Sequence, residues 1–342
     1  MKNYKIDTLC VQAGYEPKSG EARIPPIAQS TTFFYGKTQD MADLFDLKSE
    51  GYFYSRLANP TVAAFEGKVA ALEGGLCGIG CASGMSATSL TIFTVAGAGD
   101  NVVSSSAIYG GSYNLFSTTL PKLGIECRFF DPDAPAEEIE KLIDDKTKLI
   151  FTETIANPAI IVLDFDKIAK IADKYGVLFA VDNTLATPVL CRPKEFGAHI
   201  VIHSSSKYLD GHAAALGGVI VDLGNFNFKN NPRYKSFNEP DESYHGLVYA
   251  DLPVAFGTKC RAQMMRDFGA IMSPQNGFIS YIGSDTLALR MERHSENAKK
   301  VAAYLKKHPK IEWINHPSLP DNKYHGLAQK YLPDGQGGML SF

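Results

Sequence analysis

The strongest constraint on the fold of this chain is a regular alternation of predicted strands and helices between residues 60 and 222. The strand segments are mainly apolar, and the segments between them have the periodicity of amphipathic helices. Strands of this kind are typical of a parallel sheet that helices cover on both faces. The pattern predicts strands at 100–106, 125–131, 147–154, 177–184 and 199–207, and helices at 60–75, 83–99, 110–124, 135–144 and 163–176. We therefore expect an α/β fold with a mostly parallel central sheet.

The chain after residue 222 has a different character. Residues 225–246 are polar and rich in Asn and Pro, which predicts a long excursion from the sheet. Residues 285–309 have strong helical periodicity, 311–317 resemble the first strand of a smaller domain, and 337–342 resemble an incipient strand. A chain of 342 residues is long enough for two domains.

Charge and cysteine content exclude several classes of protein. The formal net charge of −3 argues against nucleic acid or an anionic membrane as the main partner. The N-terminus, MKNYKIDTLC, lacks the apolar core of a signal peptide, and no apolar run reaches transmembrane length. The six cysteines are scattered and lack zinc-finger spacing. We therefore expect a soluble, cytoplasmic protein with free thiols and no metal site.

Polar residues follow three of the predicted strands at the point where each strand ends. Glu153 ends one strand, Asp182 to Thr184 end the next, and Ser204 to Lys207 follow the last. Because ligands bind at the carboxyl ends of parallel strands, we expect these three groups to face one crevice. The last group, SSSK, brings one amine into a cluster of hydroxyls, which neither a surface nor a packed core requires.

Two other kinds of site fit the sequence poorly. The glycines between residues 75 and 84 miss the GxGxxG spacing of a dinucleotide site, and the chain has no GxxxxGK[ST] phosphate loop. A metal hydrolase built on His199, His203 and His212 would lack the helical HExxH context.

A phosphate site beside an amine fits better. Ser83 to Met85 open a predicted helix, whose free N–H groups and dipole attract anions. Ser204 and Ser206 can add hydroxyl donors, and the guanidinium of Arg56 is suited to phosphate. Read singly, Ser83 is also an ordinary helix cap and Arg56 also a surface ion-pair residue.

An amine beside a phosphate site suits pyridoxal phosphate, whose aldehyde forms a Schiff base with a lysine. Lys207 is the candidate for that lysine, and Asp182 for the carboxylate that keeps the pyridine nitrogen protonated. Tyr109 is the candidate for a stacking face. Alone, Asp182 also suits a turn and Tyr109 a core aromatic.

Seven segments resemble the Cys/Met-metabolism family of pyridoxal-phosphate enzymes, in the family's order and at its spacing along essentially the whole chain. They are PPIAQSTTF (25–33), YSRLANPT (54–61), SGMSA (83–87), YGG (109–111), ETIANP (153–158), VDNTLATP (181–188) and HSSSKYLDGH (203–212). The resemblance implies the pyridoxal-phosphate-dependent transferase fold of the aspartate-aminotransferase type (fold type I). It divides the chain into an arm that reaches a neighbouring subunit (1–58), a large cofactor domain (59–255) with an insertion near 223–250, and the start of a smaller α+β domain (256–342).

The resemblance also implies roles for single residues. It assigns the Schiff base to Lys207, the pyridine-nitrogen partner to Asp182, and a stacking, proton-handling role to Tyr109. The further contacts in the predicted cofactor site are Ser83, Gly84, Met85, Asn157, Thr184, Ser204 and Ser206. Tyr54 and Arg56 would reach the phosphate in the neighbouring subunit, so each site would need a dimer, and relatives are commonly tetramers.

Within the family, three segments resemble the O-acetylhomoserine sulfhydrylases: 236–251, 287–309 and 325–338. That implies γ-replacement on O-acetyl-L-homoserine by sulfide or a thiol, with homocysteine or methionine and acetate as products. Gly111 stands where methionine γ-lyases commonly have cysteine, which argues against that activity. Cystathionine γ-synthase or γ-lyase chemistry and a catalytically impaired relative remain open, as do the thiol used and acetyl versus succinyl activation.

The family's arginine for the substrate carboxylate lies beyond the last residue of this chain, and Arg290 and Arg293 do not occupy its motif. A bidentate anchor of this kind contributes about 1.5–3 kcal/mol. We therefore expect the 342-residue chain to bind the cofactor and to turn over substrate poorly.

Overall fold

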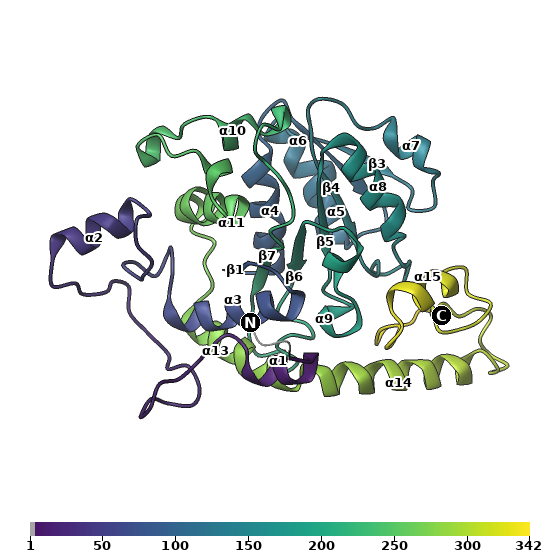
Figure 1. The fold of residues 1–342 in the computed structure, drawn as a ribbon. Coiled ribbons are helices and arrows are strands. Elements are labelled where there is room, and N and C mark those ends of the chain that lie inside the picture. Colours follow the sequence, from purple (N-terminus) through teal and green to yellow (C-terminus); the bar gives the residue numbers. More distant parts are fainter. Residues whose placement is uncertain (1–3) are drawn as a thin grey trace.

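The computed structural model describes residues 4–342, which are built around one seven-stranded sheet (Figure 1). Its strands are β1 (Cys77–Cys81), β2 (Asn101–Ser105), β3 (Glu126–Phe130), β4 (Thr147–Glu153), β5 (Leu178–Asp182), β6 (Ile200–His203) and β7 (Gly218–Asp222). The order across the sheet is β1-β7-β6-β5-β4-β2-β3. The strands from β6 to β3 run parallel, and β7 runs antiparallel to both of its neighbours. The predicted, mostly parallel sheet is therefore confirmed.

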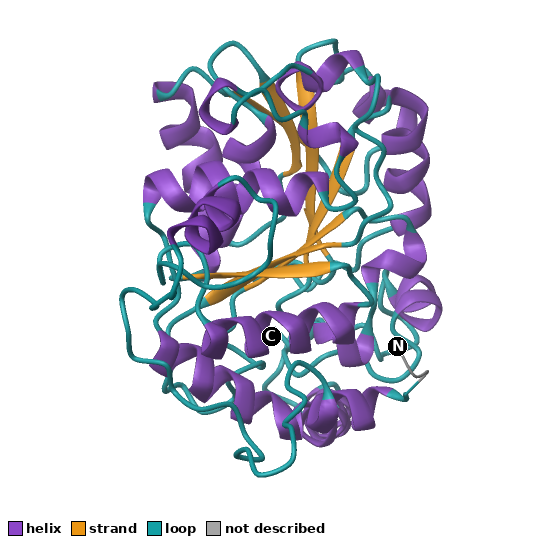
Figure 2. Ribbon diagram, turned by 60° about the vertical axis from the view of Figure 1, so that its left-hand side comes forward, coloured by secondary structure: helices purple, strands orange, loops and turns teal. Residues whose placement is uncertain are grey.

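Helices cover both faces of the sheet (Figure 2). The α-helices of the described residues are α1 (Ile6–Gln12), α2 (Thr38–Phe45), α3 (Pro60–Glu73), α4 (Gly84–Val95), α5 (Gly110–Asn114), α6 (Leu120–Lys122), α7 (Ala136–Glu140), α8 (Phe165–Tyr175), α9 (Thr187–Leu190), α10 (Lys235–Asn238), α11 (Ala255–Lys259), α12 (Arg266–Phe268), α13 (Pro274–Gly283), α14 (Leu287–Leu305) and α15 (His325–Tyr331). One core contains Phe65 of α3, Phe165 of α8 and Met291 of α14. A second core contains Leu90 of α4 and Phe116, which follows α5.

Two helix starts follow from capping residues in the sequence. The side chain of Asn59 accepts a hydrogen bond from the N–H of Thr61 at 3.0 Å, and Pro60 is the first residue of α3. Ser83 caps α4 in the same way, through the N–H of Ser86 at 3.1 Å. The predicted starts of both helices are confirmed.

Two strands, β1 and β7, are absent from the sequence prediction. β1 has the sequence CGIGC, and glycine weakens strands, so the segment carries little strand signal. The glycines are needed because α3 lies close: a Cβ on Gly78 would fall 2.5 Å from the carbonyl oxygen of Glu66. β7, with the sequence GVIVD, is a short apolar run directly after a glycine-rich stretch, which is ambiguous by itself.

The strand expected at 311–317 is wrong. The segment is irregular, and Asn315 forms an isolated bridge with Ser341. A single bridge gives too few backbone hydrogen bonds and too little side-chain burial to build a ladder, and Trp313 is 56% exposed. The helix expected at 285–309 is confirmed as α14, whereas α7 is shorter than predicted.

The polar excursion after β7 packs on the sheet through its aromatic residues. Phe228, Tyr234 and Phe237 belong to the second core. The hydroxyl of Tyr234 donates to the carbonyl of Lys148 and accepts the N–H of Leu178, both at 2.7 Å. The segment is therefore tied to β4 and β5 although its composition is polar.

Between α1 and α3 the chain leaves the body of the molecule as an arm that carries α2 (Figure 1). Apolar side chains of this arm face solvent, with Phe34 94% and Phe45 55% exposed. Exposed apolar surface of this kind is typical of contacts with another chain. Among residues 4–342, no helix has both the length and the apolar character needed to cross a bilayer.

Candidate active site

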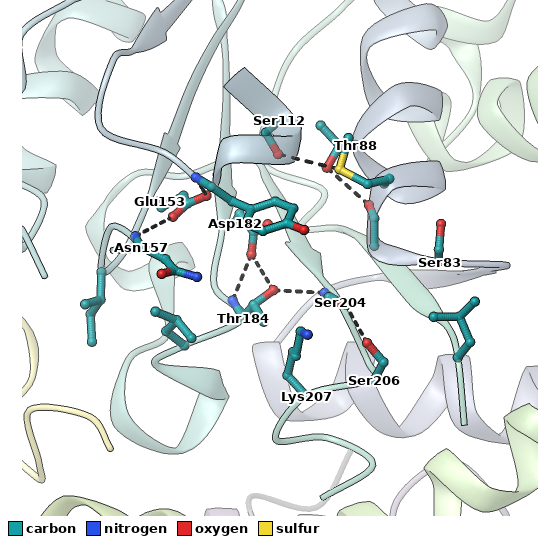
Figure 3. Close-up of a pocket in the computed structure, with 16 residues that line it drawn as sticks. Ser83, Thr88, Ser112, Glu153, Asn157, Asp182, Thr184, Ser204, Ser206 and Lys207 are labelled. Carbon is teal, nitrogen blue, oxygen red and sulfur yellow. Dashed lines mark hydrogen bonds between the residues drawn. The ribbon is translucent and has the colours of Figure 1, made fainter. Parts of the chain in front are cut away.

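The carboxyl ends of β4, β5 and β6 border a cavity of about 260 Å³ (Figure 3). The residues that line it are Ser83, Gly84, Met85, Thr88, Tyr109, Ser112, Glu153, Ile155, Asn157, Asp182, Thr184, Leu185, Ser204, Ser206, Lys207 and Leu216. Glu153 at the end of β4 pairs in register with Asp182 at the end of β5. The three polar groups expected to share one crevice do so.

Asp182 is oriented by the residue two positions further along the chain. The N–H and the hydroxyl of Thr184 both donate to Oδ1 of Asp182, at 2.9 and 2.5 Å. The Thr184 hydroxyl also accepts the N–H of Ser204 at 2.8 Å, which links β5 to the segment after β6. Burial raises the pKa of Asp182, and the Thr184 hydrogen bonds oppose that rise. Oδ2 has no hydrogen-bond partner among residues 4–342, so it can accept one from a group in the cavity.

The N-terminus of α4 forms one wall of the cavity. The first N–H groups of a helix have no intrahelical acceptor, and here they belong to Gly84 and Met85. The hydroxyls of Ser204 and Ser206 lie 2.9 Å apart beside the same cavity. Ser83 lines the cavity, but its hydroxyl is engaged as the helix cap. The result is a polar cradle of backbone N–H groups and hydroxyls that suits an anion.

Gly84 leaves no room for a side chain in this cradle. A Cβ at that position would lie 2.6 Å from the Cβ and 2.9 Å from the hydroxyl of Ser204. Glycine is therefore required here so that the start of α4 can approach the segment after β6.

Lys207 lies in a helical turn that follows β6. Its N–H donates to the carbonyl of Ser204 at 3.3 Å, and its carbonyl accepts the N–H of Gly211 at 2.9 Å. The side chain points toward the Asp182–Thr184 pair (Figure 3). The amine has no hydrogen bond or ion pair to any other described residue, so it is available for chemistry.

Arg290 of α14 braces this turn. Its guanidinium donates to the carbonyl of Tyr208 at 2.7 Å and to the carbonyl of Gly283 at 2.8 Å. These backbone contacts engage the guanidinium, which agrees with leaving Arg290 out of the substrate-binding residues.

Tyr109 and Asn157 border the cavity from the loops after β2 and β4. The Tyr109 side chain is 49% exposed, and a Cβ on Gly111 would lie 2.5 Å from its ring. The carboxylate of Glu153 accepts the backbone N–H of Tyr109 at 2.6 Å and that of Asn157 at 3.2 Å. Burial, followed by the negative charge of Asp182, raises the pKa of Glu153 to about 8.

Tyr54 and Arg56 do not border this cavity. They lie in the arm, where the guanidinium carbon of Arg56 is 5.1 Å from the centre of the Tyr54 ring. Both border a different hollow, together with His245 and Arg266. A single chain therefore does not bring Tyr54 and Arg56 to Lys207.

The three histidines considered as metal ligands are not brought together. Nδ1 of His199 accepts the N–H of Phe179 at 2.9 Å, whereas Nε2 of His203 lies 2.7 Å from Oε1 of Glu73. Within residues 4–342, no group of three or more His, Cys, Asp or Glu side chains is placed to hold a metal ion.

The sequence did not point to five residues that line the cavity: Thr88, Ser112, Ile155, Leu185 and Leu216. Thr88 follows Gly84 by four residues on α4, so helical spacing from the predicted anion site points to it. Glu153 was expected to face the crevice, yet its partners are backbone groups, which no sequence motif records. For the apolar residues Ile155, Leu185 and Leu216, no sequence pattern indicates a place in the cavity.

This donor set fits pyridoxal phosphate. A free amine, a carboxylate oxygen and a polar cradle in one cavity match the aldehyde, the ring nitrogen and the phosphate of that cofactor. The sheet, its helical layers and the position of the cavity define an α/β enzyme of pyridoxal-phosphate fold type I. The family described as "Cys/Met metabolism PLP-dependent enzyme" matches residues 7–342, and the chain belongs to that family.

Relatives are similar along nearly the whole chain. The homocysteine/cysteine synthase of Kluyveromyces lactis is 44% identical, over 98% of this chain and 77% of its own length. The O-acetyl-L-homoserine sulfhydrylase of Leptospira meyeri is 42% identical, over 99% of this chain and 79% of its own. A solved Campylobacter jejuni structure, assigned as an O-acetylhomoserine (thiol)-lyase, matches with a TM-score of 0.95 at 41% identity. The match covers 99% of this chain and 84% of that one, which carries N'-pyridoxyl-lysine-5'-monophosphate.

Proposed function

We propose that this chain catalyses a γ-replacement that depends on pyridoxal phosphate. Sulfide or a thiol replaces the acetoxy group of O-acetyl-L-homoserine, which gives homocysteine or methionine and releases acetate. The relatives from Kluyveromyces lactis, Leptospira meyeri and Campylobacter jejuni are named for this chemistry. The observation that carries the proposal is the convergence of a free amine, a buried carboxylate and an anion cradle in one cavity.

We assign the covalent link to the cofactor to Lys207, the contact with the ring nitrogen to Asp182, and the stacking face to Tyr109. We further assign the phosphate to the cradle at the start of α4, and the ring oxygen to Asn157. The contacts so assigned are Ser83, Gly84, Met85, Asn157, Thr184, Ser204 and Ser206. The pyridoxyl-lysine of the Campylobacter jejuni relative supports a lysine in this role.

Lys207 and Asp182 have different roles in the proposed reaction. When bound, the cofactor withdraws electrons from the α-carbon of the amino acid, so that protons and the γ-acetate can leave. Lys207 would accept and return protons at Nζ. Asp182, held by Thr184 at Oδ1, would use Oδ2 to keep a proton on the ring nitrogen.

The direct test is an assay of the purified protein loaded with pyridoxal phosphate. With O-acetyl-L-homoserine and sulfide, we expect acetate and homocysteine in equal amounts. O-succinyl-L-homoserine, O-acetyl-L-serine and methionine serve as comparison substrates. Acetate released without a thiol product would instead identify an elimination enzyme, and no acetate from any of the acetyl substrates would contradict the proposal.

The cradle predicts the effect of adding one methyl group. G84A places a Cβ against Ser204, so the start of α4 and the hydroxyls must separate. We expect the Kd for pyridoxal phosphate to rise about 10-fold or more, since at least one charge-assisted hydrogen bond is lost. Titration of apoenzyme with the cofactor measures it. G110A, where an added Cβ meets nothing within 4 Å, is the matched control and should bind normally.

We also propose a cytoplasmic homo-oligomer in which Tyr54 and Arg56 complete the site of a partner subunit. Their place in the arm, outside the cavity of their own chain, supports this assignment. So do the exposed apolar side chains of the arm. The six free cysteines suit a reducing compartment.

Shared sites predict complementation between two inactive variants. K207A lacks the amine, and R56A lacks the guanidinium that serves the partner, so each homodimer is expected to be inactive. A mixed dimer holds one site with both changes and one site with neither. Random mixing should therefore restore about a quarter of the sites, by the two-fold symmetry of the dimer. Activity that stays at the level of the separate variants would show that Arg56 does not serve the partner.

A further inference from the structure

Among the residues that line the cavity, Glu153 is the one carboxylate to which the proposed reaction gives no role. It is 7% exposed and ends β4, in register with Asp182 on β5. It has no ion-pair partner in residues 4–342, and its charged neighbour in the cavity has the same sign. A buried carboxylate in such a place is costly unless hydrogen bonds hold it.

Those hydrogen bonds come from the two loops that carry proposed cofactor contacts. Oε1 accepts the N–H of Tyr109 at 2.6 Å, from the loop after β2. Oε2 accepts the N–H of Asn157 at 3.2 Å, from the loop after β4 (Figure 3). The side chains of Tyr109 and Asn157 themselves make no hydrogen bond to any described residue. Their location is therefore set by their backbones.

We propose that Glu153 is a positioning residue that holds the backbones of Tyr109 and Asn157 at a fixed spacing, and so places the stacking ring and the amide around the cofactor. The inference rests on the proposed cofactor site. It concerns the apoenzyme as well, because both hydrogen bonds form within the chain.

Glutamate meets the requirements of this role better than related side chains. Two separate N–H donors need an acceptor on each side. At a pH above its raised pKa of about 8, the Glu153 carboxylate is ionised and has two acceptor oxygens and no donor. Gln would turn an NH2 donor toward one of the two N–H groups. Asp would keep both acceptors, but it is one methylene shorter and cannot reach both loops.

The first measurement is amide hydrogen exchange in the apoenzyme. In the wild type, the N–H groups of Tyr109 and Asn157 should be protected. In E153Q, compared with the wild type at a pH above the pKa of Glu153, we expect at least one of them to exchange about 10-fold faster or more, the equivalent of one lost hydrogen bond to a charged acceptor. E153D keeps the charge but has a shorter side chain. At least one of the two N–H groups should therefore exchange as fast in E153D as in E153Q. If E153D instead behaves like the wild type, charge alone matters and the proposal is overturned.

Asp222 offers a matched control at the opposite edge of the sheet. It is also buried, and its two oxygens accept the N–H groups of Gly224 and Gly257 at 2.9 and 3.0 Å. D222N removes the same kind of contact away from the cavity. It should leave exchange at Tyr109 and Asn157 and the Kd for pyridoxal phosphate unchanged.

For E153Q, the Kd for pyridoxal phosphate should rise about 10-fold. Should E153Q not fold, the wild-type apoenzyme still decides: unprotected N–H groups at Tyr109 and Asn157 would overturn the proposal. Faster exchange in E153Q with an unchanged Kd would also overturn it, because the loops would then move without consequence for the cofactor. If the activity assay contradicted the proposed function, the exchange measurements on the apoenzyme would still test the role of Glu153.

Discussion

Replacing Lys207 by alanine is expected to lower kcat by about 10²–10⁴-fold, the range for loss of a positioned acid–base group, and to abolish covalent attachment of the cofactor. Lys207 is the only lysine that lines the cavity, so no other described amine is placed to substitute for it. It is exposed, and its amine makes no hydrogen bond or ion pair with any described residue. The variant should therefore melt at the wild-type temperature.

Lys141 provides the control for this variant. It is an exposed lysine directly after α7, outside the cavity, and K141A should retain both rate and cofactor. The two variants are compared by steady-state rate and by the absorbance of the bound cofactor. A K207A enzyme with the wild-type rate would contradict the assignment.

Asp182→Asn has the second largest expected effect, a fall in kcat of about 10²–10³-fold. The amide can still accept the Thr184 hydrogen bonds at Oδ1, so the side chain should keep its orientation. What it loses is the negative charge at the second oxygen, which holds the proton on the ring nitrogen. A shift in the absorbance of the bound cofactor should accompany the slower rate.

The thermal stability of apo D182N, unlike its kcat, is not expected to fall. Burial raises the pKa of Asp182 in the folded chain, so ionisation destabilises the fold as pH rises above the unfolded value. The asparagine is free of this cost. Apo D182N should therefore melt no lower than the wild type at pH 8, and the difference should shrink as the pH falls. A variant that lost both stability and rate would point to a structural role.

The parallel strands and their polar ends could be predicted because the signal is local. The strands β4, β5 and β6 have apolar centres and are followed or ended by polar residues such as Asp182 or Ser204, and the ends of parallel strands meet at one edge. The caps at Asn59 and Ser83 are likewise short-range features. These local signals are enough to predict that Lys207, Asp182 and the start of α4 lie at one site.

What could not be predicted depends on contacts distant in sequence. β1 is a strand because β7 pairs with it, and its glycines are there because α3 packs close. The polar segment after β7 is part of the core because Phe228 and Tyr234 pack with residues of the sheet. The role of Glu153 depends on N–H groups from two other loops. The segment 311–317 has strand-like composition but only an isolated bridge.

The central claim is the covalent link between the amine of Lys207 and the cofactor, and borohydride reduction of the loaded enzyme tests it most directly. Reduction fixes the cofactor on the lysine that holds it, and peptide mass mapping then identifies that lysine. The account predicts a pyridoxyl adduct on the peptide that contains Lys207 and on no other. An adduct on a different lysine, or none in protein that binds the cofactor, would contradict it.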